Sequence, residues 1–449
     1  MNLPTATRAV FAGAVCIAPL LLLPSCTNDL NQVPSNIASS NSLEDFGGVL
    51  NAAYYYQIGS VTPIAVMGDF RADNAVMLEP PFTEFDEFDG DLTAMEDQFF
   101  GPYYTAMYRA ILSANLVIEE SEDGDEVGEA QFLRALSYFK LVRSFGAVPL
   151  NLSPSPSPTD ESILVRRGEN EVYDQIEADL QAAISALDNS GLRSGRASQL
   201  AAQALLGKVH AQQRDYAAAE PLLAAVVNGA GAAGVMLQDN YADIFGVDND
   251  LNAEVIFATQ VSSSITDEYT FSEFWSWYGG LDTKSLTPLD PDLIAAFGGE
   301  DSEDARFPVV VDTTTLTSSA KYPQTGGPDH DWIEIRLADI ILLLAEARNE
   351  LGRDAGEVLA LLDPIRERAG LESLTADDDI DTQDEVAQAI LDERRLELAF
   401  EGQRWFDLVR TGTVNREIGV DVDPRFYLFP IPVSEVLASF GVITQNPGY

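Results

Sequence analysis

The sequence predicts a mostly α-helical protein, in which antiparallel helical hairpins form a compact superhelical body that one long, irregular insertion interrupts. Three observations support this fold class. Apolar residues recur at helical spacing over much of residues 43–260 and 329–412. Small residues fall where neighbouring helices would approach closely. The stretch from Val261 to Pro328 is rich in Ser, Thr, Gly, Asp and Pro, which indicates loops.

Residues 1–25 have the pattern of a bacterial export signal. The apolar run from Ala9 to Leu23 is too short to span a bilayer, which needs about 20 residues, but it suits a signal-peptide core. It leads into Leu23-Pro24-Ser25-Cys26, which resembles a lipoprotein cleavage box, although Pro24 departs from the usual small residue. We therefore expect cleavage before Cys26, lipidation of that cysteine, and a polar tether over residues 26–42. Ordinary secretion with a stray cysteine is the alternative.

The chain is strongly acidic. Its 72 acidic and 26 basic residues give a formal net charge of -46 at pH 7. This charge argues against nucleic acid as a partner, because phosphate binding needs basic patches. We expect adaptation to high salt, since the Debye length falls to about 3 Å at 1 M salt and repulsion between surface carboxylates is then screened.

Four helices are expected before the repeat region, each with apolar residues three or four positions apart. They cover residues 43–57, 99–118, 129–142 and 171–187. The third should end at Gly146, because Pro149 prevents its resumption. The first ends in Tyr54-Tyr55-Tyr56, which we interpret as helix packing rather than a ligand platform.

An acidic loop follows the first helix. Gly68 to Leu78 reads GDFRADNAVML, and Glu79 to Asp91 is then rich in acids and phenylalanine. Asp86, Asp89 and Asp91 offer calcium ligands but lack the spacing of an EF-hand loop. A solvated acidic loop without a metal is therefore the favoured interpretation.

Two helix pairs indicate the repeat. The first matches the tetratricopeptide pattern at Leu206-Gly207, His210, Ala219 and Leu223. Because Gly207 and Ala219 let two helices approach closely, His210 is expected to be a packing residue rather than a base or ligand. The second pair covers Trp332 to Leu351 and Gly356 to Ala369. The body should therefore consist of tetratricopeptide-like hairpins.

The insertion contains FSEFWSWYGG, Phe271 to Gly280. If this segment is helical, a stripe that includes Trp275 and Tyr278 faces the core. Trp277 falls off that stripe and would face solvent, where its ring suits stacking against a sugar or another flat ligand. The core and ligand interpretations both stay open.

The most densely charged stretch is Glu393 to Gly412, ERRLELAFEGQRWFDLVRTG, with four arginines and four carboxylates. Its charged and apolar residues share helical faces, which indicates partly buried ion pairs. We interpret it as a structural brace. An acid/base pair of Glu393 and Glu397 is the alternative.

Several segments, taken in order, resemble the SusD/RagB family of outer-membrane nutrient-binding lipoproteins. They are the box at Cys26, GDFRADN (68–74), YYTAMYRAILSAN (103–115), EAQFLRALSYFKLVRSFGAVPL (129–150), GRASQLAAQALLGKV (195–209), NYADIFGVDNDLNAEVIFATQ (240–260), IRLADIILLLAEARNELG (335–352), the brace stretch, FPIPVSEV (429–436) and QNPGY (445–449). The resemblance implies one SusD-like domain over residues 43–449, with a ligand-bearing insertion at 261–328 and an irregular tail at 413–449.

The resemblance also implies a function. SusD-like proteins are lipid-anchored at the outer membrane, cap a SusC-like TonB-dependent transporter, and deliver oligosaccharides or, in some members, peptides to it. They are binding proteins rather than enzymes and need no cofactor. Their ligand-contacting loops vary, so we take the expected contacts from the local patterns. These are Trp277, Trp275 and Tyr278, then Asp73 and Asn74, and finally Phe85 and Phe88. Asp73 and Asn74 belong to a shared motif and have a structural role as their alternative.

A secreted glycoside hydrolase is the competing class. It would need two carboxylates roughly 5 to 10 Å apart, and 72 acids leave room for such a pair. Against it, the chain has no G-x-S-x-G or H-E-x-x-H motif, and its two histidines, His210 and His330, are far apart in sequence.

Overall fold

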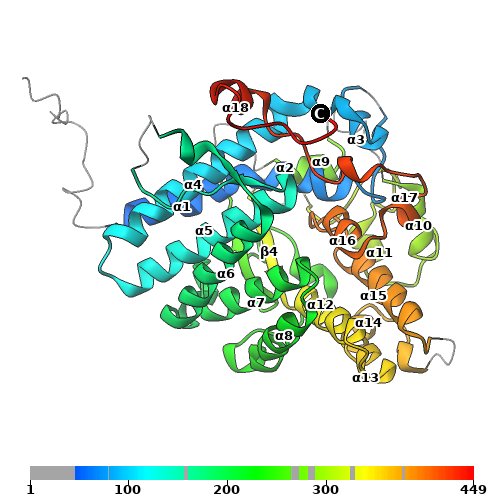
Figure 1. Cartoon of the computed structure of the whole chain (residues 1–449). Coiled ribbons are helices and arrows are strands. Elements are labelled where there is room, and N and C mark those ends of the chain that lie inside the picture. The colour runs from blue at the N-terminus through cyan, green and yellow to red at the C-terminus, as the bar shows by residue number, and fades with distance from the viewer. Residues whose placement is uncertain are drawn as a thin grey trace, which may run out of the picture. The chain divides into compact units, whose positions relative to one another are not determined.

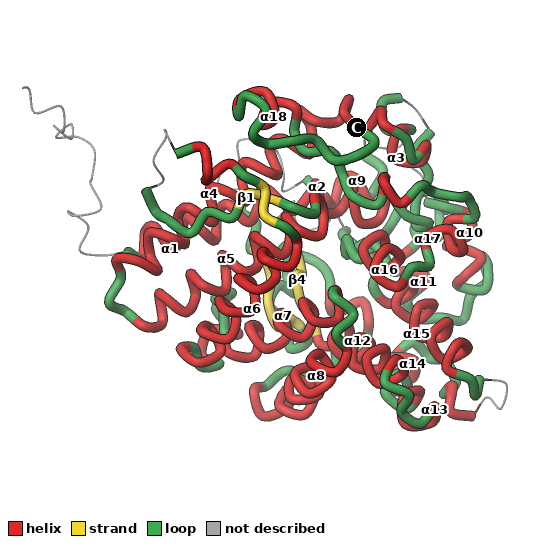
Figure 2. Tube along the Cα trace, viewed as in Figure 1, coloured by secondary structure: helices red, strands yellow, loops and turns green. Residues whose placement is uncertain are grey.

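The computed structural model describes residues 46–78, 80–155, 160–262, 264, 273–281, 289–323, 329–376 and 380–449. The expected export signal, Cys26 and the tether lie outside these residues. Glu44–Tyr449 form one compact unit, and most of its described chain is helical (Figure 2). No helix of the described chain is long and apolar enough to cross a membrane.

The first half of the unit is a series of helices with a two-stranded ladder. Its elements are α1 (Gly47–Tyr55), α2 (Val61–Ala65), α3 (Glu84–Glu87), α4 (Gly101–Glu120), α5 (Gly124–Phe145), β1 (Val148–Pro149), β2 (Arg166–Arg167), α6 (Glu169–Ala186), α7 (Gln199–Gln212) and α8 (Tyr216–Ala230). The four helices predicted by periodicity correspond to α1, α4, α5 and α6. From α4 to α8 each long helix packs against the next, as Figure 1 shows.

Helix α5 illustrates why these segments fold as predicted. The Asp123 carboxylate accepts hydrogen bonds from the first backbone N–H groups of the helix. Its predicted apolar stripe, which includes Phe132 and Phe139, is buried. The helix ends at Gly146, whose φ of +68° is readily adopted by glycine.

The pair α7 and α8 packs as closely as the tetratricopeptide spacing predicts. A Cβ atom at Gly207 would lie 2.6 Å from the side chain of Leu223, so only glycine fits without a shift. His210 is buried in the same region. Ser198 and Asp215 cap the two helices.

A second ladder marks the two ends of the insertion. Strand β3 (Val255–Thr259) precedes it and β4 (Trp332–Arg336) follows it, and the two pair antiparallel. The chain therefore leaves the body and returns to it at the same place. Here the prediction of one helix from Trp332 to Leu351 was wrong for its first five residues, which form β4. Apolar residues continue on both sides of that boundary, so periodicity could not place it.

The rest of the unit contains short helices and two long ones. The elements are α9 (Phe274–Tyr278), α10 (Pro291–Ala296), α11 (Phe307–Val310), α12 (Leu337–Glu350), α13 (Ala355–Leu359), α14 (Asp363–Arg368), α15 (Gln383–Glu397), α16 (Arg404–Thr411), α17 (Val414–Ile418) and α18 (Val433–Ala438). Helix α12 packs against both α8 and α15, and so it joins the two halves of the unit. A helix was considered at the position of α9, whereas α10 and α11 of the insertion and α17 and α18 of the tail were not expected.

Candidate functional site

The acidic loop and the insertion, which were predicted separately to contact ligand, meet around Trp277. Its ring lies 5.1 Å from that of Phe82, 5.5 Å from that of Phe99 and 6.1 Å from that of Phe70, measured between centroids. Only 4% of Trp277 is exposed. The expectation that Trp277 faces solvent was therefore wrong. Helix α9 is a single turn that packs against other segments on several sides. A residue outside its apolar stripe, such as Trp277, is therefore still buried.

Tyr278 is also a core residue. Its ring stacks between Phe70 and Tyr322, and its hydroxyl donates to Asp69 at 2.8 Å. The Asp69 carboxylate also accepts from Asn74 Nδ2 and from the backbone N–H of Gly402. Burial raises the pKa of Asp69 to about 6, although these hydrogen bonds lower it. Tyr278 and Asn74, which were predicted to contact ligand, therefore use their side chains to bind Asp69 inside the protein.

Asp73 serves the same structural purpose. Arg404 donates to both of its carboxylate oxygens at 2.7 Å, and Arg395 lies 3.3 Å away. Burial opposes ionisation of Asp73, but the hydrogen bonds and charge of Arg404, with that of Arg395, outweigh it and lower its pKa. The carboxylate of Asp73 is buried and forms a bidentate ion pair with Arg404. These contacts support a structural role for Asp73 rather than ligand binding.

The remaining expected residues differ in exposure. Phe85 is fully buried. Phe88 is half-buried, stacks on Trp405, and lies 4.7 Å from the guanidinium of Arg71. Trp275 is half-buried beside the ring of His330. Of the seven residues predicted to contact ligand, Trp275 and Phe88 alone keep partly exposed rings.

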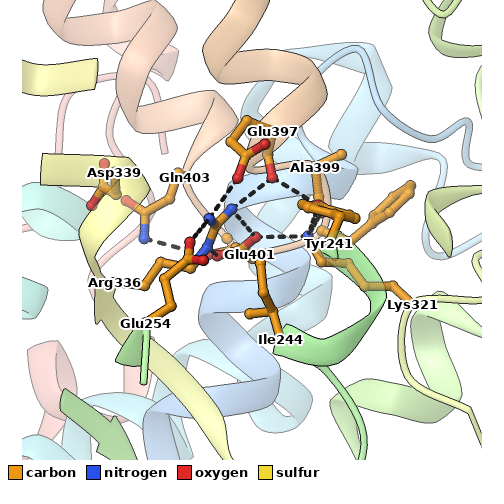
Figure 3. Close-up of polar contacts among 12 residues, drawn as sticks. Tyr241, Ile244, Glu254, Lys321, Arg336, Asp339, Glu397, Ala399, Glu401 and Gln403 are labelled. Atoms are coloured by element: carbon orange, nitrogen blue, oxygen red, sulfur yellow. Dashed lines mark hydrogen bonds and ion pairs between the residues drawn. The ribbon is translucent and has the colours of Figure 1, made fainter. Parts of the chain in front are cut away.

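The charged stretch Glu393 to Gly412 forms a buried network, which we call the cross-brace. Its members are Glu393, Arg394, Arg395, Glu397, Glu401, Arg404, Asp407 and Arg410, with their partners Asp73, Arg306, Lys321, Arg336, Asp339, Glu346, Arg366, Arg368 and Glu417, and with Glu254, which binds Arg336 and Arg368. Figure 3 shows Arg336 of β4 between Glu397 and Glu401, with Lys321 of the insertion against Glu401. The cross-brace therefore fastens the insertion and β4 to α15.

Within the cross-brace, Glu393 and Glu397 do not have the properties of a catalytic acid/base pair. Burial opposes ionisation of Glu397, but the charges of Arg368, Arg336 and Arg306 outweigh it and hold its pKa at about 2. A general acid must hold a proton near the working pH. Glu393 is likewise occupied, by Arg306 at 2.6 Å and by Arg366 at 2.9 Å. This geometry supports the interpretation of Glu393 to Gly412 as a structural brace.

A better candidate for ligand contact is a groove that we call the tyrosine groove. It has a volume of about 200 Å³ and is lined by Asn51, Tyr54, Tyr55, Gln57, Ile58, Gly195, Arg196, Phe257, Ala258, Thr259 and Gln260. Three segments far apart in sequence build it: the end of α1, the turn before α7, and β3. Half-buried aromatic rings and planar polar groups occur together there.

Contacts among neighbouring side chains hold the polar groups of the tyrosine groove in position. The guanidinium of Arg196 lies 4.4 Å above the ring of Tyr54 and donates to Asn51 Oδ1 at 2.7 Å. Glu129 binds both the hydroxyl of Tyr54 and Nε of Arg196. Stacking and ion pairing therefore fix Tyr54 and Arg196 in one arrangement, which favours a preformed site.

Gln260 lies exposed at the end of β3. Its carboxamide packs over Gly195, whose φ is +71° and which has no Cβ to fill that space. The Gln260 side chain makes no hydrogen bond with any described residue, so its donors and acceptor remain available. We did not predict this groove, and the tyrosine run that we assigned to packing was its only local signal.

A second groove combines several aliphatic side chains with two tyrosines and a few polar groups. It has a volume of about 310 Å³ and is lined by Tyr104, Thr105, Tyr108, Arg109, Leu112, Pro149, Asn151, Ile163, Leu164, Glu435 and Ile443. We call it the aliphatic groove. Its lining includes Leu112, which is 43% exposed. Its aliphatic residues, Leu112, Ile163, Leu164 and Ile443, suit apolar side chains better than they suit sugar hydroxyls.

The chain is similar to a group of known binding proteins. Residues 26–210 match the family described as "Starch-binding associating with outer membrane", and residues 310–422 match the SusD family. SusD-like protein P2 of Formosa agariphila is 26% identical over 422 residues, which cover 80% of this chain and 82% of that protein. The starch-binding protein SusD of Bacteroides thetaiotaomicron is 24% identical over 443 residues, or 77% of each chain.

Solved structures agree with this. One described as a laminarin-binding SusD-like protein has a TM-score of 0.73 and 27% identity, over 90% of this chain and 99% of that one. Bacteroides fragilis NanU, at 22% identity, has the same fold with a TM-score of 0.70, over 93% of this chain and all of that one. The two family models cover most of the segments on which the resemblance was based, but not those at 240–260, 429–436 and 445–449. The chain therefore belongs to the SusD family of outer-membrane-associated, carbohydrate-binding proteins, which bind their ligands without catalysis.

Proposed function

We propose that this protein captures oligosaccharides outside the cell and delivers them to a SusC-like, TonB-dependent transporter, beside which a lipid on Cys26 anchors it. Membership of the family supports the carbohydrate ligand and the outer-membrane location. The tyrosine groove is the observation that carries the assignment of the binding site. No bond is broken in this function, so the protein needs affinity and release rather than catalytic groups.

The chemistry of the tyrosine groove fits a sugar. A pyranose ring has apolar C–H faces that stack on aromatic rings, and hydroxyl groups that bind planar donors and acceptors at its edge. Tyr54 and Tyr55 provide the rings, while Asn51, Arg196 and Gln260 provide the planar groups. The groove accommodates a short part of an oligosaccharide, and the rest of the ligand would lie across its open side.

Weak binding at this site is compatible with delivery. Anchoring the protein beside its transporter raises the effective concentration of captured ligand at the entrance of the barrel. Co-purification of the lipidated protein with a TonB-dependent barrel tests this partner. Recovery of the protein without any barrel under conditions that preserve membrane complexes would contradict it.

The binding site is tested by calorimetric titration of soluble protein that starts after Cys26. Laminarin and starch are named as ligands of two similar proteins, and oligosaccharides made from them are the first probes. Replacing Tyr55 by Ala should weaken binding at least tenfold, or about 1.4 kcal/mol. The matched control is Tyr108→Ala in the aliphatic groove, which should bind as the unaltered protein does. Equal affinities for Tyr55→Ala and the unaltered protein would refute the site.

A peptide ligand is the second candidate function, and the aliphatic groove favours it. Exposed Leu112, together with Ile163 and Leu164, offers the apolar surface that peptide side chains bind. A peptide screen with the same protein tests this. Binding of a peptide that Tyr108→Ala abolishes and Tyr55→Ala leaves intact would assign the ligand to the aliphatic groove.

A further inference from the structure

The charges at the tyrosine groove bear on which class of sugar it can accept. Among the described residues that line this groove, Arg196 is the only charged one. The chain as a whole has a formal net charge of -46 at pH 7. An arginine with a free charge would attract anionic sugars into the groove, whereas an arginine that is already neutralised would not.

The charge of Arg196 is neutralised by Glu129 of α5, which is not among the lining residues of the groove. Nε of Arg196 lies 2.7 Å from Oε2 of Glu129, and the two side chains are 31% and 14% exposed. The same carboxylate oxygen accepts a hydrogen bond from the hydroxyl of Tyr54. Burial and the charge of Glu129 raise the pKa of Tyr54, although Arg196 lowers it. The Tyr54 hydroxyl therefore stays a proton donor to this carboxylate.

A second ion pair lies behind the groove and is also balanced. Buried Lys140 donates to Oε1 of Gln57, a lining residue, at 3.1 Å. Its ammonium lies 2.5 Å from Glu334, and the hydroxyl of Thr259, another lining residue, donates to Glu334 at 2.6 Å. The two cations next to the groove thus each have a carboxylate of their own.

The groups that remain for a ligand are neutral. Neither the carboxamide of Gln260 nor Nδ2 of Asn51 makes a hydrogen bond with a described residue, and both suit sugar hydroxyls. A ligand carboxylate or sulfate at Arg196 would lie beside Glu129, and such like charges repel each other. It would also enter the field of a protein with a large negative net charge. A hydroxyl group meets neither repulsion.

We propose, on the basis of the function proposed above for this groove, that the tyrosine groove selects neutral oligosaccharides over anionic ones such as uronates and sulfated sugars. Glu129 is the residue that sets this selectivity, because it neutralises the cation of the groove from outside the lining. It acts through Arg196 and does not itself need to touch the sugar.

The first test uses the unaltered protein that starts after Cys26. Calorimetry compares hexasaccharides of laminarin and of starch with the same hexasaccharides after oxidation of their primary alcohols to carboxylates. In 0.1 M NaCl the oxidised form should bind at least tenfold more weakly than the neutral form. In 1 M NaCl this ratio should become smaller, because the Debye length falls from about 10 Å to about 3 Å and the repulsion is screened.

The second test assigns the selectivity to Glu129. Glu129→Gln keeps a side-chain oxygen that can accept from Tyr54 and Arg196 but removes the charge, so the ratio of the two affinities should fall at least fivefold in 0.1 M NaCl. Glu220→Gln is the matched control, because it also takes a carboxylate from an arginine, Arg353 at 2.7 Å, and changes the net charge equally. This control should keep the ratio. Mere distortion of the groove would weaken both sugars alike and leave the ratio unchanged.

Two results would overturn the inference and leave the sugar site in place. They are an oxidised hexasaccharide that binds the unaltered protein as tightly as the neutral one in 0.1 M NaCl, and an unchanged ratio in Glu129→Gln. Failure of the proposed site itself looks different. In that case Tyr55→Ala would bind the neutral and the oxidised sugar as the unaltered protein does, and the inference would fall with the site.

Discussion

The cross-brace and the tyrosine groove both gather polar side chains from distant segments, yet they use them differently. In the cross-brace, Arg336 donates five hydrogen bonds, four of them to carboxylate oxygens of Glu254, Glu397 and Glu401. In the tyrosine groove, Gln260 is exposed and makes no side-chain hydrogen bond with a described residue. The dense run of charges from Glu393 to Gly412 therefore has a structural role. The unpaired hydrogen-bonding groups that a ligand could bind lie instead at Gln260, in a segment without a conspicuous sequence pattern.

The largest effect should come from breaking the cross-brace. Replacing Arg336 by Met leaves Glu254, Glu397 and Glu401 with fewer partners in a buried site, and we expect a loss of about 3 to 5 kcal/mol in the free energy of unfolding. Urea denaturation measures this loss. The folded fraction should bind oligosaccharide as before, and a stable variant that had lost binding would move the site to the cross-brace.

Trp277→Ala should have a comparable effect on stability and none on affinity. Removing this buried ring leaves a cavity among Phe70, Phe82 and Phe99, which should cost about 3 to 5 kcal/mol. Trp277→Phe is the control and should recover much of that stability. A variant that stayed fully stable but no longer bound sugar would instead support the first prediction from the sequence, that the ring of Trp277 stacks against the ligand.

The pH dependence of stability should show the cross-brace as well. The pKa of Glu397 is about 2 in the folded protein, below the ordinary value of 4.5. Its contribution is therefore fully present above about pH 4.5 and is lost as pH falls towards 2, by about 3 kcal/mol for a shift of this size. Urea titrations between pH 6 and pH 2.5 should show that Glu397→Gln loses less stability over this range than the unaltered protein does. Parallel curves would show that Glu397 is not held ionised by its arginines.

The smallest effect is expected in the tyrosine groove. Gln260→Ala removes exposed hydrogen-bonding groups, so the free energy of unfolding should change by less than about 0.5 kcal/mol. Affinity for oligosaccharide should fall by about 1 kcal/mol, or roughly fivefold. Calorimetry on this variant and on Gln238→Ala, a carboxamide that does not line the groove, would make the comparison sharper. Equal affinities in both variants would remove Gln260 from the site.

Much of the fold could be predicted from the sequence because its signals are local. The stripe of α5, its end at Gly146 and the close approach at Gly207 each depend on neighbouring residues. Strand β4 could not be predicted, because the residues from Trp332 to Leu344 are largely apolar and carry no clear period. Its identity as a strand depends on pairing with β3, which lies more than 70 residues earlier.

The site was less predictable than the fold for the same reason. Trp277 was conspicuous by residue type, but its burial depends on Phe82 and Phe99 from a distant segment. The tyrosine groove assembles Tyr54, Arg196 and Gln260 from three segments, none of which indicates a binding site by itself. Only the three-dimensional arrangement shows which polar groups are already used and which remain available.

A crystal structure of the protein with a bound oligosaccharide tests this account most directly. We predict a sugar ring stacked against Tyr54 or Tyr55, with its hydroxyl groups bound by Asn51, Arg196 or Gln260. A sugar bound instead over the acidic loop and the insertion, with the tyrosine groove empty, would contradict the central claim.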